Sequence, residues 1–556
     1  MTPASLPELL VALPALAVVM AALVIVLVEA LWRRTNARLI DGIALVGLGG
    51  AAFLETLSLR SGGDGSAIYR GAASAVSGPA TALVRQDALA AFGGLLILVA
   101  AAFTVLVGGA YVARRGLRQA EYTAVVLFAA AGMLLLGAAA DLIMIFLGVE
   151  AFSIALYVLC AFRSGDRAGY EAALKYFVLG SLAAGFLLYG TALVYGATGS
   201  TELARIGQVL ADPDGGGSAG QLSVGLAGLT LLLVGLGFKM ALVPFHQWAP
   251  DVYQGAPTPI TGFMAAATKT AATVALIRVL WTAFGGLSAT WLPAVAALAV
   301  VTMVVGNLAA IVQADVKRML AFSAIAQAGY VLVALVAATT GGVAAALYYL
   351  LAYGLAKLGA FGVLALLDGQ GSGGADDDPG RGGPAADRPA PGPRDATTLA
   401  DLAGLGRTQP WLAATMTICL MSLVGLPPMA GFLGKWMIFQ SAVDGGWTWL
   451  AVVLVLNTAL SAFYYLRPIG WMYMVEPKGN TVSDGDTVPE VGSGASFALT
   501  VAVLGLVAAL VSGGIVRVAR AADAFDQRRP DAPAGLPPEL GTATPSVTST
   551  PAGTAP

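Results

Sequence analysis

Long apolar runs separated by short polar segments recur along almost the whole chain. A helix needs about 20 apolar residues to cross a hydrocarbon core about 30 Å thick, so runs of this size predict about fourteen transmembrane helices. We therefore expect an all-α polytopic membrane protein with helices near residues 6–30, 39–60, 88–110, 121–139, 141–161, 170–198, 222–245, 257–284, 291–311, 319–339, 341–368, 408–438, 447–474 and 493–518.

Positive charges between these helices predict how the chain crosses the membrane. The first run has no positive residue before it and three arginines after it, the reverse of a signal peptide, so we expect it to remain a spanning helix. Cytoplasmic loops are enriched in Lys and Arg, which places the ends of odd-numbered helices in the cytoplasm and both termini outside. The supporting residues are Arg33, Arg34, Arg38, Arg114, Arg115, Arg118, Arg163, Arg167, Lys317 and Arg318, and the exceptions are Arg517 and Arg520.

The composition excludes several other classes of protein. The chain is 58% hydrophobic and 11% charged, with a net charge of -2, and this balance lacks the basic surface that nucleic-acid binding requires. Cys160 and Cys419 lie far apart in apolar runs, and the single histidine, His246, cannot build a haem or zinc site. We expect no cofactor and no metal here, so any redox chemistry would occur in another chain.

Ionisable residues inside the predicted helices need an explanation, because a charge at the centre of a spanning helix costs roughly 2.5 to 3.5 kcal/mol. Glu150, Lys239, Lys269, Lys357 and Lys435 all lie well inside apolar runs. Snorkelling to the headgroups is the alternative for Lys175 and the favoured explanation for Glu29 and Arg278. A purely structural ion pair within the bundle is a second alternative.

A buried lysine can also serve as a proton-loading group. Burial disfavours the charged form of an amine, and a nearby carboxylate stabilises it. If the carboxylate can approach and withdraw, the lysine binds and releases a proton, and Glu150 is the predicted partner of Lys239. Ser153, Tyr157, Thr270 and Tyr353 could hold water near these groups, although helix packing explains each of them equally well.

Prolines predict two broken helices, near 239–247 and near 425–435. Pro244 should free the carbonyl of Met240, whereas Pro427 and Pro428 should free those of Leu423 and Val424. Interrupted helices at corresponding places in two halves point to an ion site in inverted-repeat transporters.

The expected organisation follows from these breaks and from shifts in composition. Two blocks of five helices each form inverted repeats, because an odd number of spans turns the second block upside down. The predicted segments are three N-terminal helices in 1–120, repeats at 121–284 and 291–474, a flexible insertion at 369–400, a last helix at 493–518 and a disordered tail at 519–556.

The run GFKMALVPFHQWAPDVYQGAPTPITGFMAAATKTA closely resembles the most distinctive segment of the antiporter-like membrane subunits of NADH:quinone oxidoreductase, respiratory complex I. It is also similar to Mrp-type antiporter subunits. LGVEAFSIALYVL, EAALKYFVLGSLAAGFLLYG, DVKRMLAFSAIAQAGY and GLPPMAGFLGKWMIF extend the resemblance over about 120–475. AALKYFVLGS together with the lysine in GFLGKW favours the subunit N branch.

The resemblance implies roles for individual residues in proton translocation. Glu150 and Lys239 correspond to the family's key glutamate and partner lysine, Lys269 to its central relay lysine and Lys435 to its terminal lysine. Other matching positions are Lys175 and His246. The resemblance assigns no position to Lys357, which we expect to pass charge between Lys269 and Lys435.

The resemblance also implies a setting for the chain. We expect a multi-pass subunit of a bacterial cell membrane that couples electron transfer from NADH to quinone to proton pumping. Its partners would be the lipid bilayer and the antiporter-like and quinone-site membrane subunits, while NADH, FMN, iron–sulfur clusters and quinone would bind elsewhere in the complex. The alternatives are an Mrp-type cation/proton antiporter subunit and a structural membrane subunit of a related hydrogenase complex.

Overall fold

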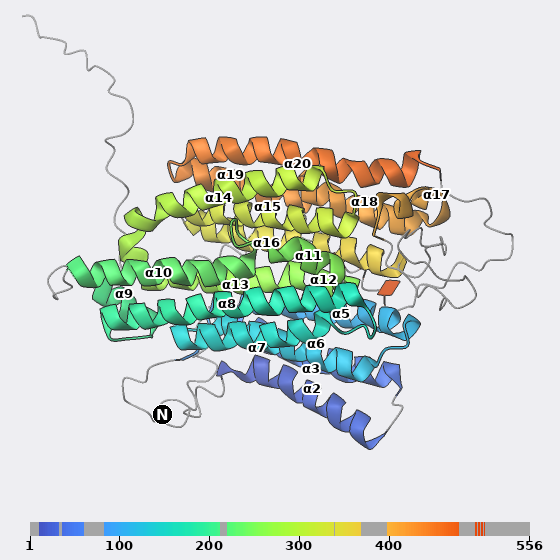
Figure 1. The fold of residues 1–556 in the computed structure, drawn as a ribbon, viewed down its shortest axis with the longest axis horizontal. Coiled ribbons are helices and arrows are strands. Elements are labelled where there is room, and N and C mark those ends of the chain that lie inside the picture. Colours follow the sequence, from blue (N-terminus) through green and yellow to red (C-terminus); the bar gives the residue numbers. More distant parts are fainter. Residues whose placement is uncertain are drawn as a thin grey trace, which may run out of the picture.

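A computed structural model describes residues 11–32, 36–60, 83–211, 219–337, 340–367, 397–476 and a few positions between 495 and 505. These residues form an all-α bundle whose long helices lie side by side (Figure 1). Segments that follow one another in sequence generally follow one another across the bundle, from α2 at one edge to α20 at the other.

The helices agree closely with the apolar runs of the sequence. Twelve helices among the described residues are long and apolar enough to cross a membrane, whereas the run at 408–438 is two shorter helices and the run at 493–518 lies largely outside the described residues. The bounds are α2 Leu13–Leu31, α3 Ala37–Arg60, α5 Ala88–Arg114, α6 Gln119–Ala138, α7 Leu142–Cys160, α8 Arg167–Thr198, α9 Leu203–Ala211, α10 Ala219–Met240, α11 Trp248–Gly255, α12 Thr258–Phe263, η1 Met264–Thr268, α13 Lys269–Ile277, η2 Arg278–Ala283, η3 Gly285–Leu287, α14 Ser288–Ile311, α15 Val316–Val336, α16 Thr340–Leu367, η5 Leu399–Leu402, α17 Leu405–Thr408, α18 Pro410–Val424, α19 Ala430–Asp444 and α20 Thr448–Met474.

Local sequence signals set several of these ends. Asp87, Asp141, Asp166 and Asp315 each accept a hydrogen bond from a backbone N–H of the first turn of the following helix, which satisfies one of the donors left free there. At the other end of α8, Gly199 adopts a φ of +71°, a conformation that glycine reaches without steric cost.

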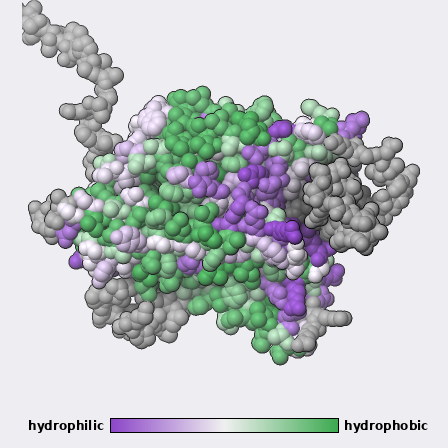
Figure 2. All heavy atoms as spheres, in the orientation of Figure 1, coloured by the Kyte–Doolittle hydropathy of each residue, from purple (hydrophilic) through white to green (hydrophobic). Residues whose placement is uncertain are grey.

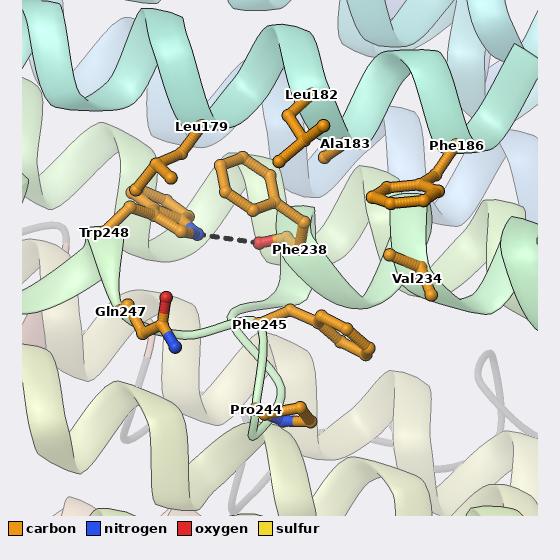
Figure 3. A pocket seen from close by; sticks show the side chains of 10 residues that line it. All are labelled: Leu179, Leu182, Ala183, Phe186, Val234, Phe238, Pro244, Phe245, Gln247 and Trp248. Atoms are coloured by element: carbon orange, nitrogen blue, oxygen red, sulfur yellow. Dashed lines mark hydrogen bonds between the residues drawn. The ribbon is translucent and has the colours of Figure 1, made fainter.

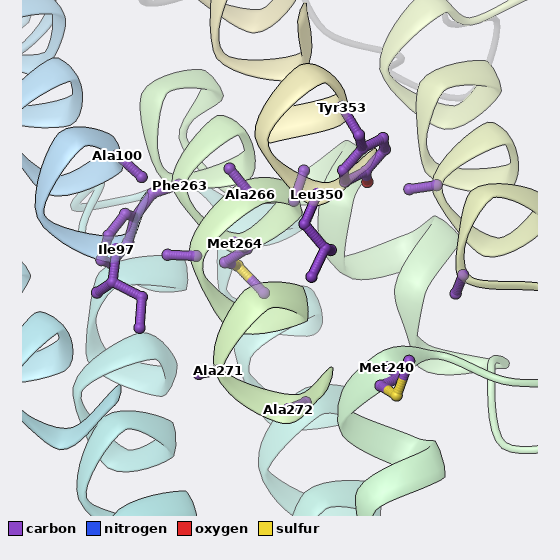
Figure 4. Close-up of a cluster of buried hydrophobic side chains, with 14 of the residues drawn as sticks. Ile97, Ala100, Met240, Phe263, Met264, Ala266, Ala271, Ala272, Leu350 and Tyr353 are labelled. Carbon is purple, nitrogen blue, oxygen red and sulfur yellow. The ribbon is translucent and has the colours of Figure 1, made fainter. Parts of the chain in front are cut away.

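The centre of the bundle is the continuous span Thr258–Ala283, in which every residue except Thr282 is buried. Figure 4 shows part of this core, where Phe263 and Met264 lie among side chains of α5 and α16, including Ile97 and Leu350. In contrast, the outward face seen in Figure 2 is mostly hydrophobic, with a hydrophilic patch toward one end. An apolar outer face around a buried span that carries a lysine is the arrangement expected of a membrane protein.

Only the end of the predicted insertion lies within the described residues. The insertion at 369–400 lies outside the described residues except for its last four positions, which are described and pair with the segment before α15. The N–H of Val316 donates to the Thr397 carbonyl over 2.6 Å, and that of Leu399 donates to the Ala314 carbonyl. The predicted tail at 519–556 also lies outside the described residues.

Candidate functional site: a row of buried lysines

Helix α10 is interrupted at the first predicted break, and side chains of neighbouring helices form hydrogen bonds with backbone groups that the break leaves free. The helix ends at Met240 and resumes as α11 at Trp248. The N–H of Val243 donates to the hydroxyl of Thr302 on α14, and the indole of Trp248 donates to the Phe238 carbonyl over 2.9 Å. An interrupted helix is stable inside a membrane only when its free backbone groups find such partners.

Lys239, in the last turn of α10, is buried in a cage of aromatic rings. Its Nζ atom lies between 5.1 and 5.7 Å from the centroids of four rings, which belong to Phe152, Tyr157, Tyr176 and Phe238. The ring faces attract a cation within about 6 Å. The amine nitrogen nevertheless has no hydrogen-bond partner among the described residues. The aromatic rings are therefore its immediate surroundings, and no acceptor orients its N–H bonds.

Glu150, the predicted partner of Lys239, is half-buried on α7 and does not form an ion pair with it within the described part of the chain. The two charges still interact electrostatically over a longer distance. The Oε1 atom of Glu150 and the hydroxyls of Tyr157 and Tyr176 are buried without hydrogen-bond partners. Buried polar atoms of this kind normally bind water or another polar group, so the region between Glu150 and Lys239 is suited to a mobile proton.

An apolar cavity of about 250 Å³ lies beside the cage, between α8, α10 and the break (Figure 3). Phe238 lines the cavity and also belongs to the cage, and Trp248 stacks on Tyr176 with ring centroids 4.4 Å apart. Phe238 therefore lies between Lys239 and the apolar cavity.

Lys269 begins α13 at the centre of the bundle, directly after the π-helical segment η1. Its Nζ atom donates a hydrogen bond to the Met240 carbonyl over 2.6 Å. This carbonyl is the acceptor that Pro244 was expected to free, but the lysine that uses it comes from a different helix. The hydrogen bond to the Met240 carbonyl thus links Lys269 to the residue that directly follows Lys239.

Lys357 on α16 is fully buried against α15. Its Nζ atom donates to the Leu320 carbonyl over 2.8 Å and also to the hydroxyl of Ser323. Its charge also interacts with that of Lys269. The structure therefore brings Lys357 into the same row as Lys269.

Lys435 on α19 is buried at the second break, between α18 and α19. Its Nζ atom donates to the carbonyls of Leu423 and Val424 over 3.1 and 2.9 Å, the two acceptors that Pro427 and Pro428 were expected to free. The face of Tyr330 lies 4.8 Å from the same nitrogen. A buried lysine therefore lies close to this break, as Lys239 does to the first one.

Tyrosines and amides fill the space between Lys357 and Lys435. Lys357 lies over Tyr353, which stacks on Tyr349, and Tyr349 packs edge-on against Tyr330 beside Lys435. The hydroxyl of Tyr349 donates to Gln327. Further hydrogen bonds join Gln327 to Tyr465 over 3.1 Å, Tyr464 to Asn307 over 2.9 Å and Asn307 to Asn457 over 3.0 Å. Hydroxyl groups both donate and accept, which suits them to pass a proton.

Two of the predicted site residues lie apart from this row. Lys175 is about two-fifths exposed and forms ion pairs of 2.7 Å with Glu171 and Asp251, and Asp251 also pairs with Arg318 over 2.6 Å. His246 lies in the first break, half-buried, with a buried Nδ1 that has no hydrogen-bond partner. Asp251 was not singled out in the sequence, although it lies within the longest quoted motif.

Ser153 and Thr270 donate to carbonyls one turn back in their own helices, as packing residues do. The hydroxyls of Tyr157 and Tyr353 have no partner among the described residues. Of the four residues expected near water, these two therefore retain polar atoms that could bind it.

The snorkelling explanation of Arg278 is wrong. Its guanidinium is buried and forms two hydrogen bonds, of 2.7 and 3.0 Å, with the carboxylate of Asp87. Lys317, assigned to a cytoplasmic loop, is also fully buried and donates to the Ala256 carbonyl over 2.8 Å. Both residues lie near helix ends in the sequence, but the ends of these helices are covered by neighbouring segments. The sequence signal for this ion pair was a carboxylate, Asp87, directly before an apolar helix, where a buried arginine could find a counter-charge.

No group of three His, Cys, Asp or Glu side chains that could hold a metal ion occurs among the described residues. The central row consists of lysines, hydroxyls and the backbone carbonyls to which the lysines donate.

The family model described as "NADH:quinone oxidoreductase/Mrp antiporter, TM" matches residues 139–461. The chain is 40% identical over 460 residues to NADH-quinone oxidoreductase subunit N 2 of Roseiflexus castenholzii, covering 81% of this chain and 85% of that protein. The residues matched by the family model include both breaks and every lysine of the row.

Two solved structures have the same fold. A chain of respiratory complex I from Thermus thermophilus with bound aureothin superposes with a TM-score of 0.69 at 33% identity, covering 90% of this chain and 98% of that one. A chain of the Mrp complex from Dietzia sp. gives a TM-score of 0.75 at 22% identity, covering 94% and 97%. The second likeness concerns the fold alone.

Proposed function

The chain belongs to the NADH:quinone oxidoreductase/Mrp antiporter family of membrane subunits, and we propose that it is a subunit N-type, proton-translocating subunit of an NADH:quinone oxidoreductase. The observation that carries this proposal is the row of four buried lysines, Lys239, Lys269, Lys357 and Lys435, that runs from one broken helix to the other. Ionisable side chains inside a membrane protein are costly and commonly mark ion or proton pathways.

In this proposal a proton enters at Lys239 and moves along the row to Lys435. Lys269 contacts the carbonyl adjacent to Lys239, interacts with the charge of Lys357, and is therefore the central relay. The tyrosines between Lys357 and Lys435 provide hydroxyl groups for the last part of the path. Transfer needs no metal or nucleotide, because each step only moves a proton between an amine and a hydroxyl or water.

Glu150 acts as the electrostatic control of the entry lysine. Lys239 is held by aromatic rings and has no hydrogen bond, so its charge responds to any carboxylate that approaches it. Glu150 is close enough to interact but is not paired with it. Movement of Glu150 toward Lys239 would stabilise the ammonium, and movement away would favour release of its proton.

The positions of the two breaks support the proposed inverted repeats at 121–284 and 291–474. In each block the broken helix is the fourth span: α10 and α11 in the first block, α18 and α19 in the second. The first break directly follows its lysine, whereas the second comes before Lys435.

The remaining parts of the assignment follow from the family. We expect the subunit to reside in a bacterial cell membrane with both termini outside, and to contact antiporter-like and quinone-site subunits. NADH, FMN, iron–sulfur clusters and quinone belong to other chains of the complex, so the energy for proton transfer reaches this subunit by conformational or electrostatic coupling. We assign Lys175 and His246 to the approach to Lys239. Lys175 forms an ion pair with Asp251 on α11, and His246 lies in the break between α10 and α11.

A cation/proton antiporter of the Mrp type is the second candidate. The charge of the row argues against a metal cation as cargo, because its central groups are lysines and cations prefer oxygen ligands. A structural subunit of a hydrogenase-related complex is the third candidate, and it predicts that neutral replacements of the lysines leave pumping intact.

The experiment uses membrane vesicles that carry the whole complex with Lys239→Ala or Glu150→Ala. Quinone reduction by NADH and proton pumping are measured together, and assembly is checked on native gels. Loss of pumping in an assembled complex supports the proton-transfer role. Normal pumping in both variants would reduce these charges to structural groups and contradict the proposal.

A further inference from the structure

A second buried cluster of ionisable groups lies away from the lysine row, at the end of the bundle where α3 ends and α5 begins. Glu55 on α3 is only 2% exposed, and the side-chain amide of Gln86 donates a hydrogen bond to its Oε2 atom. The adjacent Asp87 is held by Arg278, which also donates to the Gly137 carbonyl over 2.9 Å. The cluster therefore joins α3, the start of α5, the end of α6 and the helix that carries Lys269.

The charges in this cluster do not balance when Glu55 is ionised. Asp87 is neutralised by the guanidinium of Arg278, whereas no cation lies within ion-pair distance of Glu55 among the described residues. The charged group that acts on Glu55 is Asp87, which repels a negative charge, and Asp87 in turn interacts with Arg278 and Arg85. The side that α6 presents to this site is apolar, through Leu134. Because a buried carboxyl without a cation is more stable in its neutral form, the site favours a proton on Glu55.

The surroundings hold this carboxyl in place in either protonation state. A side chain at Gly94 on α5 would lie 2.6 Å from the Oε1 atom of Glu55, so the carboxyl occupies space that only a glycine leaves. The amide of Gln86 donates to the ionised form, and the oxygen of the same amide can accept from the protonated form. Arg85, one residue before Gln86, is exposed, so the surface is close to the site.

The helix of Lys269 reaches the same level of the bundle from the other side of α5. A side chain at Gly93 would meet Val274 and Thr270, while its neighbour Gly94 faces Glu55. Thr273, one turn beyond Lys269, is fully buried, and its hydroxyl has no partner among the described residues. Arg278 follows Lys269 by nine residues, which corresponds to about 13 Å along a helix.

We infer that Glu55 is a proton-binding group through which the lysine row exchanges protons with the aqueous phase at the end of the bundle where α5 begins. In the release direction, the ammonium of Lys269 loses a proton and becomes an amine, and the carboxylate of Glu55 gains it through Thr273 and water. Glu55 then gives the proton to water near Arg85 and returns to its ionised form. Arg278 positions Asp87, whose negative charge favours the protonated form of Glu55 and so assists its uptake of the proton from Lys269. This inference rests on the proposed function of the lysine row.

The test measures both the protonation of Glu55 and its effect on pumping in the whole complex. In Glu55→Gln, the infrared carbonyl band of a protonated carboxylic acid should be lost, whereas it should persist in Glu55→Asp. Proton pumping should fall by about tenfold in Glu55→Gln, a factor that corresponds to about 1.4 kcal/mol in the transfer barrier. Glu55→Asp, which keeps a titratable group, should recover most of it. Glu29→Gln, on α2, is the matched control and should leave the band and pumping unchanged.

An unchanged infrared band in Glu55→Gln would mean that Glu55 does not bind a proton, and wild-type pumping would mean that it does not serve the row. Either result overturns the inference. Lys269→Met, measured in parallel, separates this failure from that of the proposed function. If Lys269→Met abolishes pumping while Glu55→Gln pumps normally, only the role of Glu55 is wrong. If both pump normally, the lysine row itself does not translocate protons.

Discussion

The Nζ atom of Lys269 lies 2.6 Å from the carbonyl oxygen of Met240, the last residue of α10 before the first break. Lys435 makes the same kind of contact at the second break, to Leu423 and Val424. In both places a proline-containing interruption frees carbonyl oxygens and a buried lysine donates to them. The carbonyl dipole stabilises an ammonium ion without a permanent counter-charge, so the proton remains transferable.

Gly425→Ala should displace Lys435. Gly425 has a φ of +83°, and a Cβ there would lie 2.9 Å from the Cδ atom of Lys435. The backbone strain of about 1–2 kcal/mol is therefore accompanied by a clash with the lysine, and we expect slower proton pumping as well as a lower melting temperature. Gly446→Ala is the control, because Gly446 has a φ of +79° and nothing within 4 Å of its added Cβ. Equal pumping in the two variants would contradict the role of the contact.

Tyr349→Phe should interrupt the path between Lys357 and Lys435 while preserving the ring stack. The variant removes the hydroxyl that donates to Gln327, and loss of a buried partner costs about 1–3 kcal/mol. We expect NADH-driven proton pumping to fall while the complex still assembles. Tyr189→Phe, at an exposed position of α8, should pump like the wild type. If Tyr349→Phe also does so, protons do not pass through this hydroxyl.

Asp87→Asn should destabilise the bundle by leaving the guanidinium of Arg278 buried without its counter-charge. Breaking a buried pair on one side costs about 3–5 kcal/mol, so we expect a lower melting temperature of the purified complex. Glu121→Gln breaks the exposed pair with Arg118 and should leave the melting temperature nearly unchanged, because solvent screens exposed ion pairs. Equal melting temperatures for the two variants would show that the Asp87 pair adds no stability.

The contribution of this pair should not depend on pH in the neutral range. Burial acts to raise the pKa of the Asp87 carboxyl, but the Arg278 guanidinium outweighs it and holds the pKa below its usual value of 3.8. A lowered pKa in the folded state means that the stabilisation is complete above the unfolded pKa and is lost as the pH falls through the lowered one. The difference in melting temperature between wild type and Asp87→Asn should therefore stay constant from about pH 5 to pH 8. A difference that shrinks over this range would contradict the assignment.

The sequence predicted the spans and breaks well because each depends on local properties. Apolar length defines a spanning helix, and Pro244 and Pro427 each remove a backbone donor from the helix in which they lie. It did not predict which lysine uses the freed carbonyl of Met240, because Lys239 is nearest in sequence but its side chain lies in the aromatic cage. Lys269 reaches that carbonyl only through the packing of α10 against α13.

Positions near helix ends were the least predictable. Arg278 and Lys317 resemble residues that reach the headgroups, and whether they do so depends on which neighbouring segments cover them. Arg278 pairs with Asp87, which lies 191 residues away in the chain. Lys317 donates to the Ala256 carbonyl, which lies 61 residues away. No local pattern reports contacts over such separations. The hydrogen bond of Lys357 to Leu320 likewise depends on the packing of α16 against α15, which its position in the sequence does not indicate.

The most direct test of the lysine row is the number of protons translocated per NADH oxidised by the complex in liposomes carrying Lys269→Met. Methionine keeps an unbranched apolar side chain but removes the ammonium that contacts the Met240 carbonyl and interacts with Lys357. If protons pass through the row, the ratio should fall in a complex that is fully assembled on native gels. A ratio equal to that of the wild type would contradict the account, because the central relay would then be dispensable.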